Sequence, residues 1–307
     1  MRFIDVNMQI DGECKCGGKR LTRASTRLKL DSPLFAVVTV VFNGAEALEA
    51  TIHSVLSQSY KNFEYIVIDG GSTDGTLDLL RKYEHSIDYW VSEPDKGVYD
   101  AFNKACRLIT GEWTIFLGAG DVLHDESVLE SMSETVSRVS AEIEIVYGKV
   151  CLTDSRNRPF ETLNRPWEQM RDRWQGGRPV FPHHQGIFHR RPILAGKNPF
   201  DTTYRIAADS KVFYDSMKRA TPVFADLTIA TSTLGGLSTD PKYYVANIEE
   251  IVRINREMGF ANFGHELWFS RKSAFKYALY KIGGDKLAKR CVDIYRKLTG
   301  RRPKWLE

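Results

Sequence analysis

The sequence predicts an α/β fold, and three observations lead to this prediction. Short apolar runs rich in β-branched and aromatic residues recur between residues 33 and 150. Segments whose apolar residues recur at helical spacing separate these runs. Aspartates follow two of the runs, at Asp69 and at Asp121. Alternation of this kind implies a mostly parallel sheet that helices cover on both faces.

The first expected element is a strand at 35–42, because this run is almost wholly apolar and β-branched. The same pattern predicts further strands at 63–68, 89–91, 113–117 and 143–150. Between the strands, apolar residues that recur every three or four positions predict helices at 46–56, 74–83 and 98–109, and one through Val128, Met132 and Val136.

The second half of the chain has a different pattern. Residues 151–200 are rich in Arg, Pro, Gly and Trp, so we expect an irregular region that carries function. Helical spacing returns at 206–217 and at 244–258. The last helical stretch, 265–298, is expected to form two helices that break at Gly283 and Gly284.

The composition is that of an ordinary globular protein, with 307 residues, 42% hydrophobic residues and a net charge of +4. A nucleic-acid partner is not expected, because the charge is small and no recognition motif is present. Five unevenly placed cysteines predict a reducing compartment and no disulfide framework. We find no apolar stretch of signal-peptide or membrane-span length, and we therefore expect a cytoplasmic protein.

Two loops after the expected strands carry candidate binding residues. Asp69 opens the segment 69–76, whose glycines allow a sharp turn and close approach of a ligand. This segment is neither a P-loop nor a dinucleotide fingerprint, and its leading carboxylate favours contact with a ribose or a base. In the second loop, Asp95 precedes a helix N-terminus that suits a diphosphate. Alternatively, Asp69 and Asp121 only cap helices or stabilise turns.

Several ordered motifs together resemble family 2 glycosyltransferases of GT-A fold. The motifs that carry the resemblance are Val38–Asn43, Ser54–Tyr60, Ile68–Thr76, Glu93–Lys104 and Gly111–Leu117. The likeness covers about residues 33–236 and is greatest to bacterial enzymes that build exopolysaccharide, capsule or lipopolysaccharide. It implies a Rossmann-like mixed sheet flanked by helices, with a helical C-terminal extension. We therefore expect a basic N-terminal tail at 1–32, a GT-A domain at 33–236 and a basic helical extension at 237–307.

The resemblance implies roles for matching positions. The positions expected to contact the donor nucleotide are Phe42, Asn43, Asp69, Asp95, Asp100 and Asn103. Asp121 matches the acid that touches a divalent cation, Mn²⁺ or Mg²⁺. The family usually has a second acid directly before it, whereas this chain has Gly120. One carboxylate can suffice, because Mg²⁺ and similar ions are often held by one or two carboxylates plus phosphates and waters. A metal-independent or impaired enzyme is the alternative.

Further along the chain, the resemblance implies an acceptor side and a catalytic base. The segment Pro182–Phe188 and the following arginines place His184, Gln185 and Arg190 on the acceptor side. Asp209 matches the position of the general base, and Gly235–Ser238 resembles a flexible segment that shapes the donor pocket. A structural histidine and a first-turn helix aspartate remain the alternatives for His184 and Asp209.

The implied reaction is transfer of a sugar, with inversion, from a nucleotide-diphosphate donor to a hydroxyl of a saccharide acceptor. Two alternatives stay open. A catalytically impaired partner subunit would explain Gly120. A nucleotidyltransferase also uses strand-end acids and a metal, but it normally needs a basic phosphate loop after the first strand, which Asn43–Glu46 does not supply.

Both ends of the chain are basic. Residues 14–29 hold six Lys or Arg and no acid, and residues 271–304 hold twelve against Asp285 and Asp293. Aromatic and aliphatic residues interleave with the C-terminal cations, which suits helices that lie on an anionic membrane. Such contact with the inner face of the plasma membrane would fit a lipid-linked acceptor. A helical cap on the core with solvated cations is the alternative.

Overall fold

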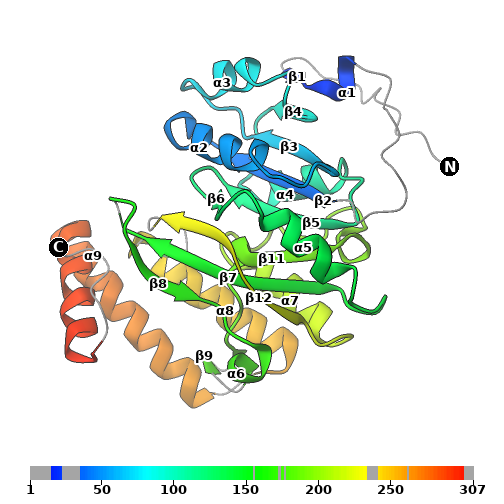
Figure 1. Ribbon diagram of the computed structural model, residues 1–307. Coiled ribbons are helices and arrows are strands. Elements are labelled where there is room, and N and C mark those ends of the chain that lie inside the picture. The colour runs from blue at the N-terminus through cyan, green and yellow to red at the C-terminus, as the bar shows by residue number, and fades with distance from the viewer. Residues whose placement is uncertain are drawn as a thin grey trace.

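The computed structural model describes residues 15–22, 35–154, 156–171, 174–175, 178–233, 241–260 and 263–300. Its centre is a ten-stranded mixed sheet with the strand order β1-β4-β3-β2-β5-β11-β7-β12-β6, to which β8 adds at β7 (Figure 1). This mixed α/β architecture confirms the predicted fold class.

The first half of the sheet is parallel, as predicted. Its strands are β2 (Phe35–Val41), β3 (Phe63–Asp69), β4 (Tyr89–Ser92) and β5 (Trp113–Gly118). β2 pairs in parallel with both β3 and β5, and β3 pairs in parallel with β4. The carboxyl ends of these strands therefore meet at one edge of the sheet. The helices around them are α2 (Ala45–Leu56), α3 (Thr76–Lys82), α4 (Val98–Cys106) and α5 (Val128–Val136).

The second half of the sheet corrects the expectation of an irregular region at 151–200. This region contains β11 (Ile187–Arg190), which lies between β5 and β7 (Ile145–Thr153) and is antiparallel to both. Its other regular elements are β8 (Pro159–Leu163), α6 (Trp167–Arg171), the short ladder of β9 (Trp174–Gln175) with β10 (Arg178–Pro179), and the 3₁₀ turns η1 (His184–Gly186) and η2 (Arg191–Leu194). Two further strands were not expected: β12 (Val223–Thr233), parallel to β7, and β6 (Val122–Leu123).

The alternating side chains of the strands divide the core into two layers. On β2, Ala36, Val38 and Val40 face the layer that includes α4 and α7 (Ala208–Met217). The residues between them face the layer that includes α2 and α5. Strands with apolar residues on both faces are typical of a sheet covered on both sides. This explains why the central strands could be predicted from continuous apolar runs.

The described part of the N-terminal segment, residues 15–22, is attached to the sheet. β1 (Lys15–Gly17) pairs antiparallel with β4, and α1 (Lys19–Thr22) follows. Arg20 of α1 forms an ion pair with the buried Glu64. Glu64 also accepts hydrogen bonds from the amides of Thr110 and Gly111, at 2.6 and 2.7 Å. The acid therefore joins the N-terminal segment to the turn before β5.

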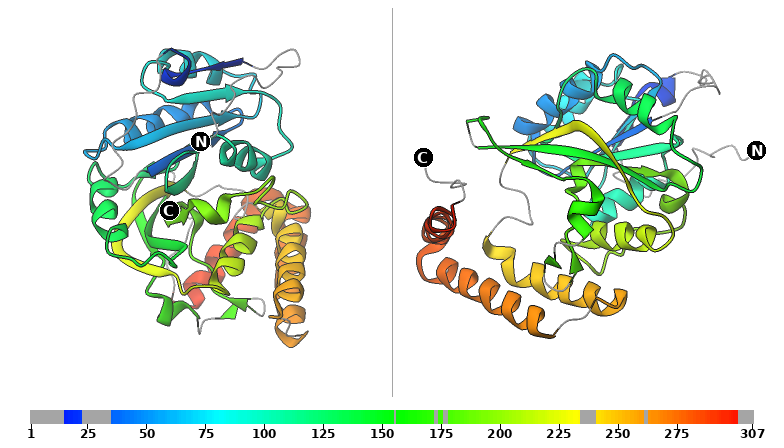
Figure 2. Two further views of the ribbon diagram at one scale, coloured as in Figure 1. Left: turned by 90° about the vertical axis from the view of Figure 1, so that its right-hand side faces the viewer. Right: turned by 60° about the horizontal axis from the view of Figure 1, so that its bottom comes forward.

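The C-terminal extension is helical, as predicted. α8 (Tyr244–Met258) is followed by α9 (Phe263–Leu298), and both lie at the end of the molecule opposite β1 (Figure 2). α9 bends sharply where Gly284 leaves the helical region, with φ 68° and ψ −169°, which confirms the predicted break. Among the described residues, we find no helix with the length and apolar character needed to cross a bilayer.

Candidate active site

The predicted site residues gather mostly at the edge where the parallel strands end. β3 ends at Asp69, and Asp121 follows the end of β5. The antiparallel β11 begins at this same edge, so the preceding turn η1 brings His184 and Gln185 beside these acids. The carboxyl end of β12 brings Ser232 to the same edge. Four segments that are distant in sequence therefore converge there.

Asp69 is fully buried and organises its own loop. Its carboxylate accepts hydrogen bonds from the Ser72 amide at 3.1 Å, from the Ser72 hydroxyl at 2.5 Å and from the Ser92 hydroxyl at 2.6 Å. These bonds join the loop after β3 to the end of β4. The geometry favours the turn-stabilising interpretation of Asp69, because a ligand could reach its oxygens only if this loop moved.

The loop 69–76 is joined to the turn after β2. The amide of Asn43 donates to the Ser72 hydroxyl at 2.7 Å, and the Asn43 side-chain oxygen accepts from the Thr73 amide at 2.9 Å. Asn43 has φ 48°, in the left-handed region, so the turn reverses sharply at this residue. Phe42, directly before it, is 65% exposed. An exposed aromatic ring at this rim suits stacking against a base.

Asp95 and Asp100 lie in one turn close to the same rim. Asp95 Oδ1 accepts from the Gly97 amide at 2.8 Å, and Asp100 Oδ2 accepts from the Lys96 amide at 3.1 Å. A Cβ atom placed on Gly70 would lie 2.5 Å from Asp95 Oδ2, so a larger residue here would displace the Asp95 carboxylate. Burial raises the pKa of Asp95, and the charges of Asp100 and Asp69 add to this effect.

Asn103 does not lie in this rim. It is fully buried, and its amide both donates to the Phe200 carbonyl at 2.7 Å and accepts from the Phe200 amide at 2.9 Å. These two bonds attach α4 to the segment before α7. The expectation that Asn103 contacts the donor is therefore corrected: its polar groups position the backbone.

Asp121 accepts two hydrogen bonds and lies close to a third segment. Its oxygens accept from the Gly118 amide at 2.9 Å and from the Ser232 hydroxyl at 2.5 Å, and the Gln185 side chain is near enough to lower its pKa. Burial is the largest effect on this carboxyl and raises its pKa, while the hydrogen bonds oppose the rise. Ser232 could not be predicted from the sequence, because Asp121 and Ser232 are 111 positions apart.

The residues at Asp121 fit one divalent cation whose other ligands come from outside the chain. Among the residues that the structure describes, no three His, Cys, Asp or Glu side chains are close enough to hold a metal by themselves. A hard cation bound through one carboxylate plus diphosphate oxygens and waters needs no such cluster. A cation would also offset the burial that disfavours the Asp121 carboxylate.

Gly120 replaces the expected second acid and has a backbone role. Its φ is 98°, which favours glycine, and its amide donates to the Thr51 hydroxyl at 2.9 Å. A Cβ atom added at Gly120 would meet the Ala47 Cβ at 3.4 Å, an ordinary contact. Strain from the dihedral angle rather than lack of space is therefore the obstacle to an acid at this position.

Asp209 lies in the first turn of α7, close to residues of two other elements. The Tyr99 hydroxyl donates to Asp209 Oδ1 at 3.0 Å, and His184 Nδ1 lies 3.9 Å from Asp209 Oδ2. Phe102 and Phe116 stack against the His184 ring, with centroid distances of 5.2 and 5.8 Å. Tyr99 lies within a motif that pointed to the family, but the sequence did not indicate its contact with a residue 110 positions away.

His184 is neutral, and no hydrogen bond among the described residues fixes its ring nitrogens. Neither ring nitrogen has a hydrogen-bond partner among the described residues, although both nitrogens are buried from solvent. Burial lowers the pKa of His184 to about 4. A neutral imidazole beside Asp209 can donate or accept one hydrogen bond from a hydroxyl group. This arrangement suits the predicted acceptor side.

The backbone before Asp209 is held by a residue from the C-terminal extension. The Glu250 carboxylate of α8 accepts from the amides of Arg205, Ile206 and Ala207, at 2.6, 2.8 and 2.9 Å. Three charge-assisted bonds to successive amides fix the path of this segment into α7. Sequence reasoning missed Glu250, because nothing local distinguishes it from a solvent-facing helix acid.

Arg190 is not brought to the acceptor side. In the antiparallel register it pairs with Trp113, the first residue of β5, at the opposite edge of the sheet. Its guanidinium lies 4.7 Å from the centre of the Trp113 ring and 3.3 Å from the Glu112 carboxylate. The expected role of Arg190 is therefore corrected to a structural one. The predicted segment Gly235–Ser238 lies outside the described residues.

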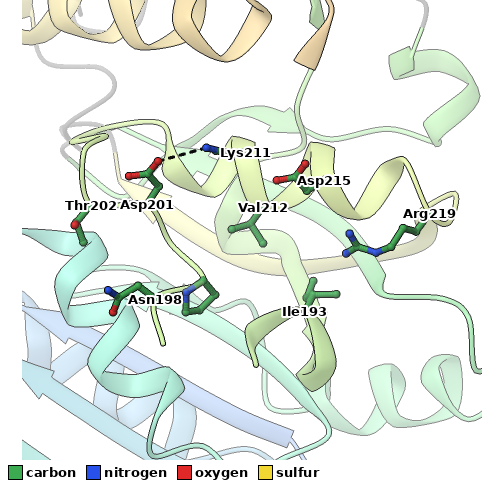
Figure 3. Close-up of a pocket in the computed structure, with 9 residues that line it drawn as sticks. Ile193, Asn198, Asp201, Thr202, Lys211, Val212, Asp215 and Arg219 are labelled. Atoms are coloured by element: carbon green, nitrogen blue, oxygen red, sulfur yellow. Dashed lines mark hydrogen bonds and ion pairs between the residues drawn. The ribbon is translucent and has the colours of Figure 1, made fainter. Parts of the chain in front are cut away.

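A separate hollow of about 520 Å³ lies against α7 (Figure 3). Its charged groups already have partners: Lys211 lies 3.3 Å from Asp201, and Arg219 lies 2.7 Å from Glu144. Asp209 is not among the lining residues. The hollow is therefore distinct from the cluster around Asp209.

The buried histidines predict a pH dependence of stability. Burial lowers the pKa of His189 to about 3 and that of His184 to about 4, against 6.5 for an ordinary histidine. Below pH 6.5 the unfolded chain therefore binds protons that the folded chain does not, so the free energy of unfolding should fall as the pH falls. The expected slope is roughly 1.4 kcal/mol per pH unit for each histidine down to its folded pKa.

Urea unfolding at several pH values between 7 and 4.5 measures this slope. The variant His189→Gln should show a shallower slope than the unchanged protein, whereas the control His53→Gln removes an exposed histidine and should leave it unchanged. Equal slopes for all three proteins would contradict the assignment.

The chain matches known proteins over the region that builds this site. Residues 36–195 match the family model described as glycosyl transferase family 2. The chain is 32% identical over 190 residues to a PGL/p-HBAD biosynthesis glycosyltransferase of Mycobacterium tuberculosis, covering 58% of this chain and 67% of that protein. It is 39% identical over 92 residues to the putative teichuronic acid biosynthesis glycosyltransferase TuaG of Bacillus subtilis, covering 29% of this chain and 36% of that protein.

Solved structures share the architecture at low sequence identity. A mannosyltransferase of Pyrobaculum calidifontis, solved with GDP-Man and Mn²⁺, has a TM-score of 0.58 at 17% identity, covering 90% of this chain and 83% of that one. TarS of S. aureus has a TM-score of 0.52 at 14% identity, covering 86% and 76%. This likeness supports the fold, and the family match covers just over half of the chain. The chain therefore belongs to glycosyltransferase family 2 and has the GT-A fold.

Proposed function

We propose that this glycosyltransferase moves a sugar, with inversion, from a nucleotide-diphosphate donor to a hydroxyl of a lipid-linked saccharide in cell-surface polysaccharide synthesis. One observation carries the proposal. Asp121 and Asp209 both lie close to one dipeptide: the Gln185 side chain interacts with the Asp121 carboxyl and lowers its pKa, and His184 Nδ1 lies 3.9 Å from Asp209 Oδ2. A group that holds the leaving diphosphate and a group that accepts a proton are thus close together.

Each residue has a distinct role in the proposed reaction. The rim of Phe42, Asn43, Asp95 and Asp100 binds the nucleoside, and Asp121 would hold a divalent cation beside the diphosphate. A bound cation of this kind offsets the charge that develops on the leaving group. Asp209 accepts the proton of the acceptor hydroxyl, which His184 helps to orient. A single base opposite the leaving group leads to inversion.

The names of similar proteins support the substrate class. The similar mannosyltransferase was solved with GDP-Man and Mn²⁺, and TarS with UDP-GlcNAc. The curated relatives are named for the biosynthesis of PGL/p-HBAD and of teichuronic acid. A nucleotide-sugar donor and a surface glycan product agree with these names.

The impaired partner subunit is the second candidate, and Gly120 is the observation that favours it. Nucleotide binding without transfer or donor hydrolysis would support that candidate. A nucleotidyltransferase is less well supported, because the turn after β2 carries Asn43 and Gly44 in place of a basic phosphate loop.

The C-terminal helices offer a surface for an anionic membrane. Trp268, Phe275 and Ile282 are spaced by seven residues on α9 and are 60%, 65% and 82% exposed. Residues seven apart lie on nearly the same face of a helix. The exposed cations Arg271 and Lys281 lie on the same stretch of α9, before the bend at Gly284. An apolar stripe bordered by cations suits the headgroup region of an anionic bilayer, where a lipid-linked acceptor would lie.

The role of Asp209 predicts a large loss of turnover in Asp209→Asn. General-base catalysis typically contributes ~10²–10⁴-fold in rate, so kcat should fall by that factor while nucleotide affinity stays within about twofold. Product release from UDP-GlcNAc and GDP-mannose, with saccharide acceptors, measures the rate. Asp215→Asn, on a different face of α7, is the matched control and should keep full activity. Undiminished turnover in Asp209→Asn would remove this residue from the mechanism.

The role of Asp121 predicts a metal-dependent donor affinity. In a thermal-shift screen, Mn²⁺ should increase the stabilisation by the accepted nucleotide sugar, because the cation bridges the protein and the diphosphate. Asp121→Asn should lose most of this increment while keeping the stabilisation seen without metal. An identical metal increment in the variant would count against the assignment.

The membrane assignment predicts binding to anionic vesicles only. The unchanged protein should co-sediment with phosphatidylglycerol vesicles but not with phosphatidylcholine vesicles, since each cation near the surface contributes ~1 kcal/mol before screening. The triple variant Trp268→Ser, Phe275→Ser, Ile282→Ser should bind at least tenfold more weakly. A control that changes Glu134→Ser and Arg138→Ser near α5 should bind normally. Equal sedimentation of both variants would show that the apolar stripe does not bind the membrane.

A further inference from the structure

We propose that Tyr99 is a positioning residue that orients the Asp209 carboxylate and connects it to the turn of Asp95 and Asp100. The inference rests on the proposed function, in which Asp209 is the general base. The Tyr99 hydroxyl donates to Asp209 Oδ1 at 3.0 Å across 110 residues of sequence. No comparison or motif assigns a role to this contact.

The surrounding rings hold the Tyr99 hydroxyl in place. Tyr99 is 5% exposed, and its ring is stacked nearly parallel to Phe200, at a centroid distance of 6.0 Å and an interplanar angle of 12°. Phe102 meets it edge-on at 5.8 Å. A packed ring has few alternative rotamers, so the hydroxyl oxygen has a defined position. The base is therefore oriented by a rigid group rather than by a mobile side chain.

The hydroxyl remains a donor at physiological pH. Burial raises the pKa of Tyr99 well above its ordinary value, and the charge of Asp209 raises it further. The protonated hydroxyl thus donates to the carboxylate, an arrangement that stabilises the charged form of Asp209. The Ser210 amide donates to the same oxygen, Oδ1, at 2.8 Å. Two donors from different elements define the orientation of this carboxylate.

Three elements bring titratable groups toward Asp209. Tyr99 comes from α4, His184 from η1 and Glu250 from α8. His184 is neutral above about pH 4, so it does not change charge in the range where the enzyme would work. Glu250 acts on this region through the amides of 205–207. Of these three groups, Tyr99 is the one that donates a hydrogen bond directly to the Asp209 carboxylate.

The position of Tyr99 in α4 couples the base to the nucleotide rim. Tyr99 is the second residue of α4, next to Asp100 and four residues after Asp95. The turn that precedes the helix is tightened by the bonds that the Gly97 amide donates to Asp95 and the Lys96 amide donates to Asp100. A nucleotide held by these acids would fix the first turn of α4, and with it the hydroxyl that orients Asp209. Donor binding would thereby prepare the base before the acceptor reacts.

The variant Tyr99→Phe tests the inference, because it keeps the ring and removes only the hydroxyl. Without this donor, the titration midpoint of the Asp209 carboxyl should rise by about one pH unit. Carboxyl ¹³C NMR of aspartate-labelled protein measures the midpoint with no substrate present, and Asp209→Asn identifies the signal. With the donor found by the thermal-shift screen, kcat should fall at least tenfold, the acid limb of its pH profile should move up by about one unit, and nucleotide affinity should change less than twofold.

Tyr65→Phe is the matched control, since Tyr65 is fully buried and its hydroxyl lies 3.1 Å from that of Thr39, away from Asp209. It should leave the Asp209 midpoint and the pH profile unchanged. An unchanged midpoint in Tyr99→Phe would overturn the inference, and so would a lower kcat without any movement of the pH profile. Full turnover in Asp209→Asn would instead refute the proposed base, while the NMR titration would still report on the Tyr99 contact.

Discussion

The site depends on the antiparallel insertion of β11 between β5 and β7. Because Phe188 pairs with Ile115 on one side and Val146 on the other, the chain entering β11 must lie at the carboxyl edge of β5. This register carries η1 to the acids at that edge. A slip by one residue would turn Phe188 out of the core layer that it shares with Trp113 and would move His189 into it. The burial of Phe188 therefore specifies where His184 and Gln185 lie.

The loop around Asp121 has Gly120, with a positive φ, at the position where the family resemblance predicts a second acid. Gly120 adopts φ 98°, and the turn it allows is supported by Thr51 and by the bond from the Asp121 amide to the Gly118 carbonyl at 3.0 Å. Asp121 then accepts from the Gly118 amide and the Ser232 hydroxyl, so two segments distant in sequence orient one carboxylate. These bonds orient the Asp121 carboxylate, as the single-carboxylate cation site proposed above requires.

The strands and helices that depend on a local sequence pattern were predicted most accurately. The parallel strands and their helices were found within a few residues, because their apolar runs are continuous and their spacing is regular. β11 was not predicted, because its four residues lie in an Arg- and Pro-rich region and do not form a continuous apolar run. Asn103 and Arg190 were assigned by motif alone, and only the fold reveals that their polar groups face Phe200 and Glu112. Tyr99, Ser232 and Glu250 form hydrogen bonds across 110, 111 and 43–45 residues, beyond the reach of local reasoning.

The contacts of α8 argue against treating the C-terminal extension as a separate unit. Glu250 holds three successive amides just before Asp209, and Lys211 of α7 lies 2.9 Å from Glu257. The path of the backbone into α7 is thus set partly by a helix that follows the GT-A domain. α8 also packs against α9, the helix with the exposed apolar stripe. Through these contacts, α8 connects α9 to the segment that carries the proposed base, Asp209. If that role is correct, the extension helps to position the base and is more than an attached anchor.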